Sequence, residues 1–159
     1  MNTVKIDLCG LPDELRSGLE KLCMHEGFRS GTDGIRLSAR RGGAFSAEFD
    51  GQTLRVEYCE PVQFFRALSY LKRADHRRFA LHRQPVFEHN GVMLDCSRNA
   101  VPRVEAVKMV LRKMALMGLN TLMLYTEDTY EVPEQPYFGY LRGRYSVEAL
   151  RGLDSYAAA

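Results

Sequence analysis

The stretch Gly91-Val-Met-Leu-Asp-Cys-Ser-Arg98-Asn-Ala-Val-Pro102 contains a short apolar run that ends in a polar cluster. A segment with helical periodicity follows from Val104 to Met117, and Gly118 closes it. A second apolar run, Thr121-Leu-Met-Leu-Tyr125, then ends in Thr126-Glu127-Asp128. This order predicts a strand, a helix and a second strand, with polar residues at the carboxyl end of each strand. Ligands bind at that edge in α/β folds.

Both strand segments resemble the first two barrel strands of the family-20 glycoside hydrolases, the β-N-acetylhexosaminidases. In that family the first strand reads roughly Gly-x-x-Leu-Asp-x-Ser-Arg-x-x-x-Pro, and the second runs from Asn-x-Leu into an acidic turn. Both patterns occur here in the same order, from Gly91 to Pro102 and from Asn120 to Asp128. The resemblance implies that residues 89–159 begin a catalytic (β/α)8 barrel.

The first 88 residues have a pattern of their own, which predicts a separate α+β domain. Glu60-Pro61 and the region around Pro12 each open a helix with an apolar stripe. Asp50-Gly51 lies between two alternating runs and predicts a type I′ hairpin, in which both central residues have positive φ. The order β-α-β-β-β-α-β predicts a mostly antiparallel sheet with two helices. Family-20 enzymes commonly carry a small α+β domain before the barrel, which agrees. The expected strands cover 4–8, 35–39, 45–49, 54–58 and part of 79–87.

The length of the second part predicts an incomplete barrel. A complete (β/α)8 barrel needs about 250 residues, whereas about 70 follow His89. Residues 146–159 have helical periodicity and end in three alanines, without a Gly, Asn or Pro to signal a C-cap. We therefore expect an N-terminal fragment: an α+β domain (1–88) followed by the first β-α-β-α portion of a truncated TIM barrel (89–159).

Arg98 is the residue that we expect to bind substrate. It follows the strand 92–94, so it should lie at the mouth of the barrel. A guanidinium has five fixed donors and can bind two neighbouring sugar hydroxyls at once. The resemblance implies this role, because the family's arginine in this motif binds the distal hydroxyls of the terminal sugar. The alternative is an arginine that pairs with Asp95 or caps a loop.

Three acidic residues are expected to orient the groups of the site or to fix its loops, without binding the substrate themselves. The resemblance implies that an acidic residue after the second strand orients groups near the catalytic pair. The family commonly has Thr-Asp-Asp there, whereas this chain has Thr126-Glu127-Asp128, so both Asp128 and Glu127 are candidates. Tyr125 replaces a frequent His. Asp95 is expected to fix the loop that carries Arg98. Two acidic residues after a strand are otherwise often solvated turn residues.

The loop 130–145 is rich in aromatic residues, with several prolines and glycines between them. It has two interpretations that the sequence leaves open. An aromatic loop at a barrel mouth can stack against the apolar faces of sugars, or it can pack on itself as an Ω-loop. Arg142 and Arg144 lie in this loop, and nothing in the sequence singles out either of them.

The catalytic residues themselves are expected outside this sequence. The family's catalytic pair is an adjacent Asp-Glu after the fourth barrel strand, which would come beyond residue 159. Asp13-Glu14 is also an adjacent Asp-Glu pair, but it begins a helix of the first domain, where acidic residues stabilise the helix N-terminus. We therefore assign no catalytic residue in this chain.

Composition excludes some classes of partner. A net charge of +2 gives no reason to expect nucleic acid, and no apolar run is long enough for a membrane span. The four histidines and the four scattered cysteines have no metal-ligand spacing, and no phosphate-binding Gly-rich loop occurs, so neither a metal nor a cofactor is expected. Free thiols and the lack of a signal-peptide core favour a cytoplasmic location.

The expected parent protein is a retaining exo-β-N-acetylhexosaminidase. The resemblance implies that it hydrolyses terminal β-linked N-acetylhexosamine in oligosaccharides or glycoconjugates by substrate-assisted catalysis, and that the fragment is inactive by itself. Because the truncated barrel leaves strand edges unpaired, a homo-oligomer joined through residues 91–125 is expected. The alternative is a complete, non-enzymatic α/β module that binds carbohydrate or protein.

Overall fold

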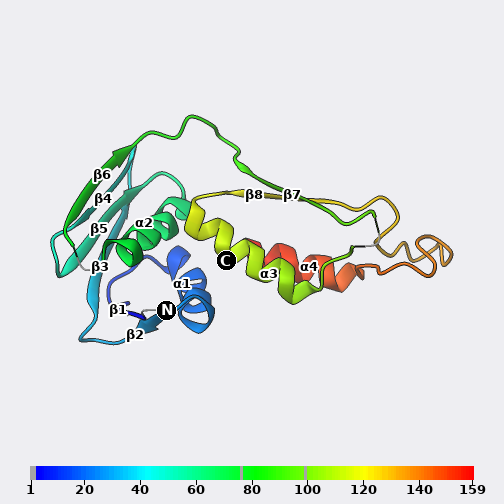
Figure 1. The fold of residues 1–159 in the computed structure, drawn as a ribbon, viewed down its shortest axis with the longest axis horizontal. Helices are drawn as coiled ribbons and strands as arrows, with labels where there is room; N and C mark the ends of the chain where they lie inside the picture. The colour runs from blue at the N-terminus through cyan, green and yellow to red at the C-terminus, as the bar shows by residue number, and fades with distance from the viewer. Residues whose placement is uncertain (1–2, 76, 99) are drawn as a thin grey trace.

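The computed structural model describes residues 3–75, 77–98 and 100–159, in which two sheets and four helices are present (Figure 1). Asn99, within the stretch 91–102, and His76, one of the four histidines, lie outside the described residues. The first part contains β1 (Val4–Asp7), α1 (Asp13–His25), β2 (Phe28–Ser30), β3 (Ile35–Arg41), β4 (Phe45–Phe49), β5 (Thr53–Tyr58), α2 (Pro61–Ala74) and β6 (Phe79–Arg83). The second part contains β7 (Gly91–Asp95), α3 (Val104–Met117), β8 (Thr121–Tyr125) and α4 (Val147–Ala157).

The first sheet is mixed, with the strand order β2-β1-β3-β5-β4-β6. β1 pairs in parallel with β2 and β3, and β3 pairs in parallel with β5. Among the described strands, the antiparallel pairings are those of β4 with β5 and with β6. The prediction of a mostly antiparallel sheet is therefore wrong, because β5 inserts between β3 and β4 and prevents them from forming a hairpin. β2 was not predicted, since three residues are too few for an alternating pattern.

The hairpin at Asp50-Gly51 is confirmed as the connection between β4 and β5. Its turn type differs from the prediction, because Gly51 has a φ of +102° whereas Asp50 is outside the left-handed region. The Asp50 carboxylate accepts hydrogen bonds at Oδ1 from the amides of Gln52, at 2.9 Å, and Thr53, at 2.8 Å. These bonds form an Asx-type turn, in which the aspartate side chain takes the place of a backbone acceptor.

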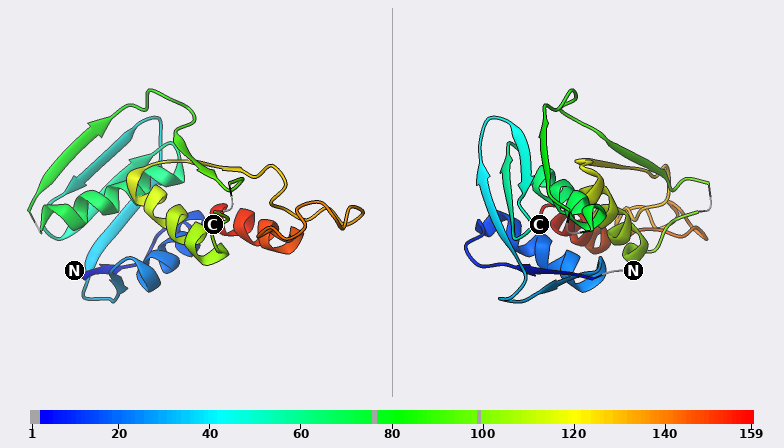
Figure 2. Two further views of the ribbon diagram at one scale, coloured as in Figure 1. Left: turned by 45° about the vertical axis from the view of Figure 1, so that its right-hand side comes forward. Right: turned by 60° about the vertical axis from the view of Figure 1, so that its left-hand side comes forward.

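Helices α1 and α2 cover one face of this sheet, as predicted (Figures 1 and 2). Pro61 lies in the first turn of α2, and Gly27 follows the C-cap of α1 with a φ of +71°. Each helix buries the apolar stripe seen in the sequence, and the buried side chains include Leu15, Leu19, Leu22, Phe64, Leu68 and Leu71. Their partners are the inward side chains of the strands, among them Ile6, Leu37, Phe49, Leu54 and Val56.

The second part follows the predicted order of strand, helix, strand and helix. β7 and β8 pair in parallel, and α3 forms the connection between them. Gly118 ends α3 with a φ of +77°, a conformation that glycine adopts without a steric penalty. Ser146 begins α4, because its side chain accepts a hydrogen bond from the amide of Ala149 at 3.1 Å.

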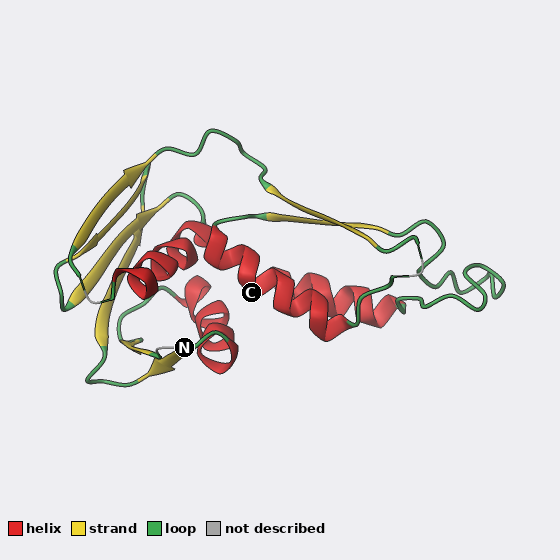
Figure 3. Cartoon of the chain, in the orientation of Figure 1, coloured by secondary structure: helices red, strands yellow, loops and turns green. Residues whose placement is uncertain are grey.

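The two parts meet through their helices. Ala115 and Leu116 of α3 pack against the core of the first part. In Figure 3 the helices lie between the six-stranded sheet and the two-stranded sheet. A second, smaller core beneath β7 and β8 includes Cys96, Val107, Tyr145 and Leu153. The strand ends that carry the candidate site are therefore held on a packed base.

Candidate functional site

The carboxyl ends of β7 and β8 lie side by side. Asp95 pairs with Tyr125 in the last step of the register, and the amide of Cys96 donates a hydrogen bond to the Tyr125 carbonyl at 2.9 Å. Cys96 is completely buried, which anchors the loop after β7. The polar residues that follow both strands are thus gathered at one edge, beside the loop that extends furthest from the first sheet in Figure 1.

The β7–β8 pair has one covered face and one open face. Leu94, Leu122 and Leu124 pack with the small core beneath α3. On the opposite face the side chains of Met93 and Met123 are 59% and 57% exposed. Strand alternation places Asp95 and Tyr125 on the same open face as these methionines. Side chains at the strand ends therefore point toward a surface that the described residues do not cover.

Asp95 and Arg98 form a weak, exposed ion pair. The Arg98 Nε lies 3.6 Å from the Asp95 Oδ2, and the Arg98 side chain is 86% exposed. Asp95 uses Oδ1 to accept hydrogen bonds from the Ser97 hydroxyl, at 2.6 Å, and the Ser97 amide, at 2.9 Å. These two bonds hold the pKa of Asp95 below its usual value. Asp95 holds the loop in place, while the Arg98 side chain is largely exposed to solvent.

Glu127 and Asp128 differ in what they contact. Glu127 has a φ of +47° and accepts a hydrogen bond from the Tyr125 hydroxyl at 3.2 Å, which raises the pKa of that tyrosine. The Asp128 Oδ1 lies 3.2 Å from the Arg142 Nη1. The two carboxylates therefore point to different partners: Glu127 stays with its own strand end, and Asp128 faces the loop 130–145.

Arg142 joins the ends of both strands. Its Nη1 pairs with Asp128 after β8, and its Nη2 donates to the Ser97 carbonyl after β7. No sequence pattern distinguishes Arg142 from Arg144, because a loop arginine has no periodicity and its partners are distant in the chain. Arg144 instead donates to the Phe138 carbonyl within the same loop, at 2.6 Å.

The loop 130–145 packs largely on itself. Tyr130 and Tyr145 form a bridge that closes its base, and the Tyr145 hydroxyl donates to the Pro102 carbonyl at 2.6 Å. Phe138 packs edge-on against Tyr130, with 5.2 Å between ring centroids. The side chain of Tyr137 at the tip is 84% exposed. The base has the character of an Ω-loop, and the tip offers an exposed aromatic ring.

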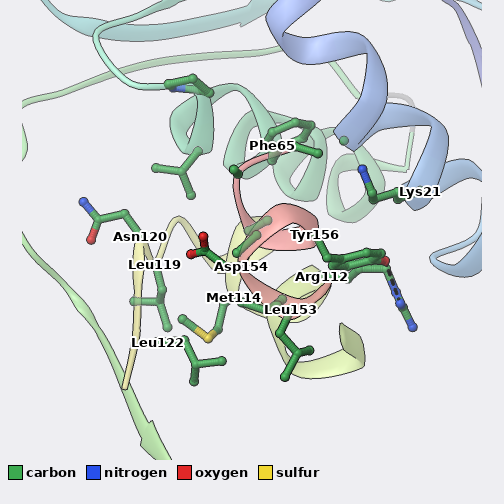
Figure 4. Close-up of a pocket in the computed structure, with 18 of the residues that line it drawn as sticks. Lys21, Phe65, Arg112, Met114, Leu119, Asn120, Leu122, Leu153, Asp154 and Tyr156 are labelled. Atoms are coloured by element: carbon green, nitrogen blue, oxygen red, sulfur yellow. Dashed lines mark hydrogen bonds between the residues drawn. The ribbon is translucent and has the colours of Figure 1, made fainter. Parts of the chain in front are cut away.

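A cavity of about 730 Å³ lies elsewhere, between α1, α2, α3, α4 and β8 (Figure 4). Apolar side chains such as Phe65, Met114 and Leu122 line much of it. Arg112 and Tyr156 approach it from one side and hydrogen-bond to each other at 2.9 Å. Of the described residues that we single out at the strand ends, none lines this cavity. It is a space between helices and strand, separate from the candidate site.

The remaining features concern the Asp13-Glu14 pair, metal ligands, membrane-spanning helices and the cysteines. Asp13 and Glu14 lie in the first turn of α1, where Glu14 pairs with Arg41 at 2.8 Å and accepts a hydrogen bond from Tyr58 at 2.6 Å. Within the described ranges, no cluster of His, Cys, Asp and Glu is arranged to hold a metal ion. Nor is any helix described there long and apolar enough to cross a membrane. Cys9, Cys23, Cys59 and Cys96 are free thiols.

Comparison with known proteins identifies the fold. No family model and no curated protein sequence matches the chain. Among solved structures, the chain is similar to the family-20 exo-β-N-acetylglucosaminidase of Vibrio harveyi in complex with N-acetylglucosamine. The TM-score is 0.71 at 18% identity, over 98% of this chain and 31% of that one. It is also similar to the N-acetyl-β-hexosaminidase of Streptomyces plicatus, with a TM-score of 0.72 at 17% identity, over 99% of this chain and 40% of that one.

A third similar structure is the β-N-acetylhexosaminidase of Bacteroides fragilis, with a TM-score of 0.66 at 15% identity, over 99% of this chain and 38% of that one. The chain thus has a mixed α/β fold that matches part of the fold of family-20 glycoside hydrolases. It spans between 31% and 40% of the length of these three enzymes. The family-20 resemblance inferred from two short motifs agrees with the fold of nearly the whole chain.

Proposed function

We propose that this chain is the N-terminal portion of a retaining exo-β-N-acetylhexosaminidase and that residues 89–159 begin its catalytic barrel. The observation that carries the proposal is the position of Arg98. Within the motif that resembles the family's first strand, Asp95 ends β7 beside the end of β8, and the Arg98 side chain, three residues further on, is 86% exposed. The fold similarity across both parts of the chain supports the same conclusion.

In this proposal the substrate is an oligosaccharide or glycoconjugate that ends in β-linked N-acetylhexosamine. Arg98 donates to the distal hydroxyls of that sugar. Asp95 fixes the loop that carries Arg98, and Glu127 and Asp128 are the candidates for orienting groups near the catalytic pair. The substrate's 2-acetamido oxygen attacks the anomeric carbon, an Asp positions the acetamido group, and a Glu protonates the leaving oxygen. The resemblance assigns the last two roles to an adjacent Asp-Glu pair beyond residue 159.

The test is hydrolysis of an aryl β-N-acetylglucosaminide by the whole protein that carries this chain and, separately, by residues 1–159. We expect turnover by the whole protein and none above a buffer blank by residues 1–159, in material free of host hexosaminidase. Turnover by residues 1–159 would contradict the assignment of the catalytic pair. No turnover by the whole protein on any aryl N-acetylhexosaminide would contradict the proposed function.

A further inference from the structure

Arg142 lies at the junction between the ends of β7 and β8, although it is 45 residues further along the chain than Ser97, which it contacts just after β7. One guanidinium nitrogen faces the Asp128 carboxylate and another donates to the Ser97 carbonyl. Ser97 in turn donates two hydrogen bonds to Asp95, whose other oxygen faces Arg98. A continuous series of polar contacts therefore runs from Asp128 to Arg98.

We propose that Arg142 is a positioning residue that sets the placement of Asp128 and of the Arg98 loop together. The inference rests on the proposed function, because it concerns how that site holds its substrate. A planar guanidinium can hold two acceptors at a fixed separation, which an ammonium group cannot do. The Arg142 side chain is 28% exposed, so solvent screens its contacts less than those of Arg98, at 86%.

The described residues do not satisfy the whole hydrogen-bonding capacity of this junction. The Arg142 Nε is a buried atom without a hydrogen-bond partner among the residues that the structure describes, and the buried Asp128 Oδ1 contacts Arg142 as an ion pair without hydrogen-bond geometry. Buried polar atoms without partners are uncommon in closed structural networks and are more typical of functional sites. The loop geometry also supports the role, because Leu141, the residue before Arg142, has a φ of +62°. A residue other than glycine rarely adopts that conformation unless its surroundings fix it.

The test compares Arg142→Gln with Arg144→Gln in the whole enzyme. Both arginines lie in the same loop and donate to a backbone carbonyl, but the bond from Arg144 goes to Phe138 and stays within the loop. We expect Arg142→Gln to lower kcat/KM by about 10²-fold, since a small misplacement of a binding group has that effect. Arg144→Gln should stay within about threefold. Arg142→Lys should recover little activity, because one ammonium cannot serve both acceptors.

A double-mutant cycle separates positioning from general destabilisation. If Arg142 acts through Arg98, Arg142→Gln should raise KM in the wild-type background and have little further effect on KM in an Arg98→Ala background. Equal effects in both backgrounds would overturn the inference, as would an Arg142→Gln variant that behaves like Arg144→Gln. If Arg142→Gln does not fold, the Arg142→Lys variant, checked by its melting temperature, takes its place in the cycle.

A second readout does not depend on catalysis. In residues 1–159 labelled with ¹⁵N, the Ser97 amide and the Arg98 Nε–H resonances should shift in Arg142→Gln and stay in place in Arg144→Gln. If the whole protein hydrolyses no aryl N-acetylhexosaminide, the proposed function fails, while these shifts still decide whether Arg142 positions the loop. Unchanged Ser97 and Arg98 resonances in Arg142→Gln would overturn the inference regardless of the activity result.

Discussion

Glu26 and Arg112 form a buried ion pair that joins the two parts of the chain, with 3.1 Å between the Glu26 Oε1 and the Arg112 Nε. Glu26 is the C-cap residue of α1 and is only 2% exposed. Lys113 pairs with its other carboxylate oxygen, and Lys72 of α2 donates to its backbone carbonyl. Glu26 thus connects α1, α2 and α3. No pattern in the sequence singles out this residue.

We expect Glu26→Gln to destabilise the chain by about 3 kcal/mol, the lower end of the range for removing one partner of a buried ion pair. The lower end applies because Lys113 is 54% exposed and can rehydrate, whereas Arg112, at 11% exposed, loses its partner inside the interface. Urea denaturation measures the difference. Glu20→Gln, an exposed change on the same helix, is the matched control and should have little effect. Equal stabilities of the two variants would contradict the structural role of Glu26.

The same pair predicts a pH dependence. Burial by itself raises the pKa of Glu26, but hydrogen bonds from Lys113 and Arg112 bring it below its unfolded value of about 4.5. Because the folded pKa is depressed, the ionised carboxylate stabilises the fold fully above about pH 4.5, and this contribution is lost as the pH falls through the folded pKa. The stability gap between wild type and Glu26→Gln should therefore be constant near neutral pH and narrow in acid. A gap that widened in acid would contradict the sign of the shift.

Local signals in the sequence predicted those elements whose causes are local. Gly118 marks the end of α3 because a left-handed residue is needed there, and Asp50-Gly51 marks a hairpin because Gly51 provides the positive φ at its tip. The two apolar runs predicted β7 and β8, which are confirmed. These features depend on residues within a few positions of one another.

The remaining features depend on distant pairings. β5 lies between β3 and β4 because of contacts along whole strands, and no turn signal encodes that order. Arg142 finds Ser97 and Asp128 only after two strands and a loop have come together. The role of Glu26 likewise requires α3 to pack on α2. Periodicity cannot indicate such residues, since each is a single charge in an otherwise ordinary segment.

We expect Arg98→Ala in the whole enzyme to lower kcat/KM by two or more orders of magnitude without loss of the fold. Each hydrogen bond from a charged donor contributes about 1.5–3 kcal/mol, and two sugar hydroxyls would lose their donor. Arg98→Lys should recover little, because an ammonium cannot reproduce the paired geometry. Arg103→Ala, which removes an exposed arginine at the N-cap of α3, is the control. Near-wild-type kinetics of Arg98→Ala would mean that Arg98 points away from the substrate.

The open face of β7 and β8 predicts that residues 1–159 associate with themselves. Met93 and Met123 are 59% and 57% exposed on this face, and the two strands form a sheet of only two among the described residues, so each has an outer edge free to pair. We expect a dimer or larger assembly joined through residues 91–125, which light scattering across a dilution series would detect. Met123→Lys places a charge on the open face and should shift the protein toward monomer. Met24→Lys changes a methionine that is 72% exposed on α1 and should leave association unchanged. A monomer at high micromolar concentration, or equal effects of the two lysine variants, would show that this face is not the site of association.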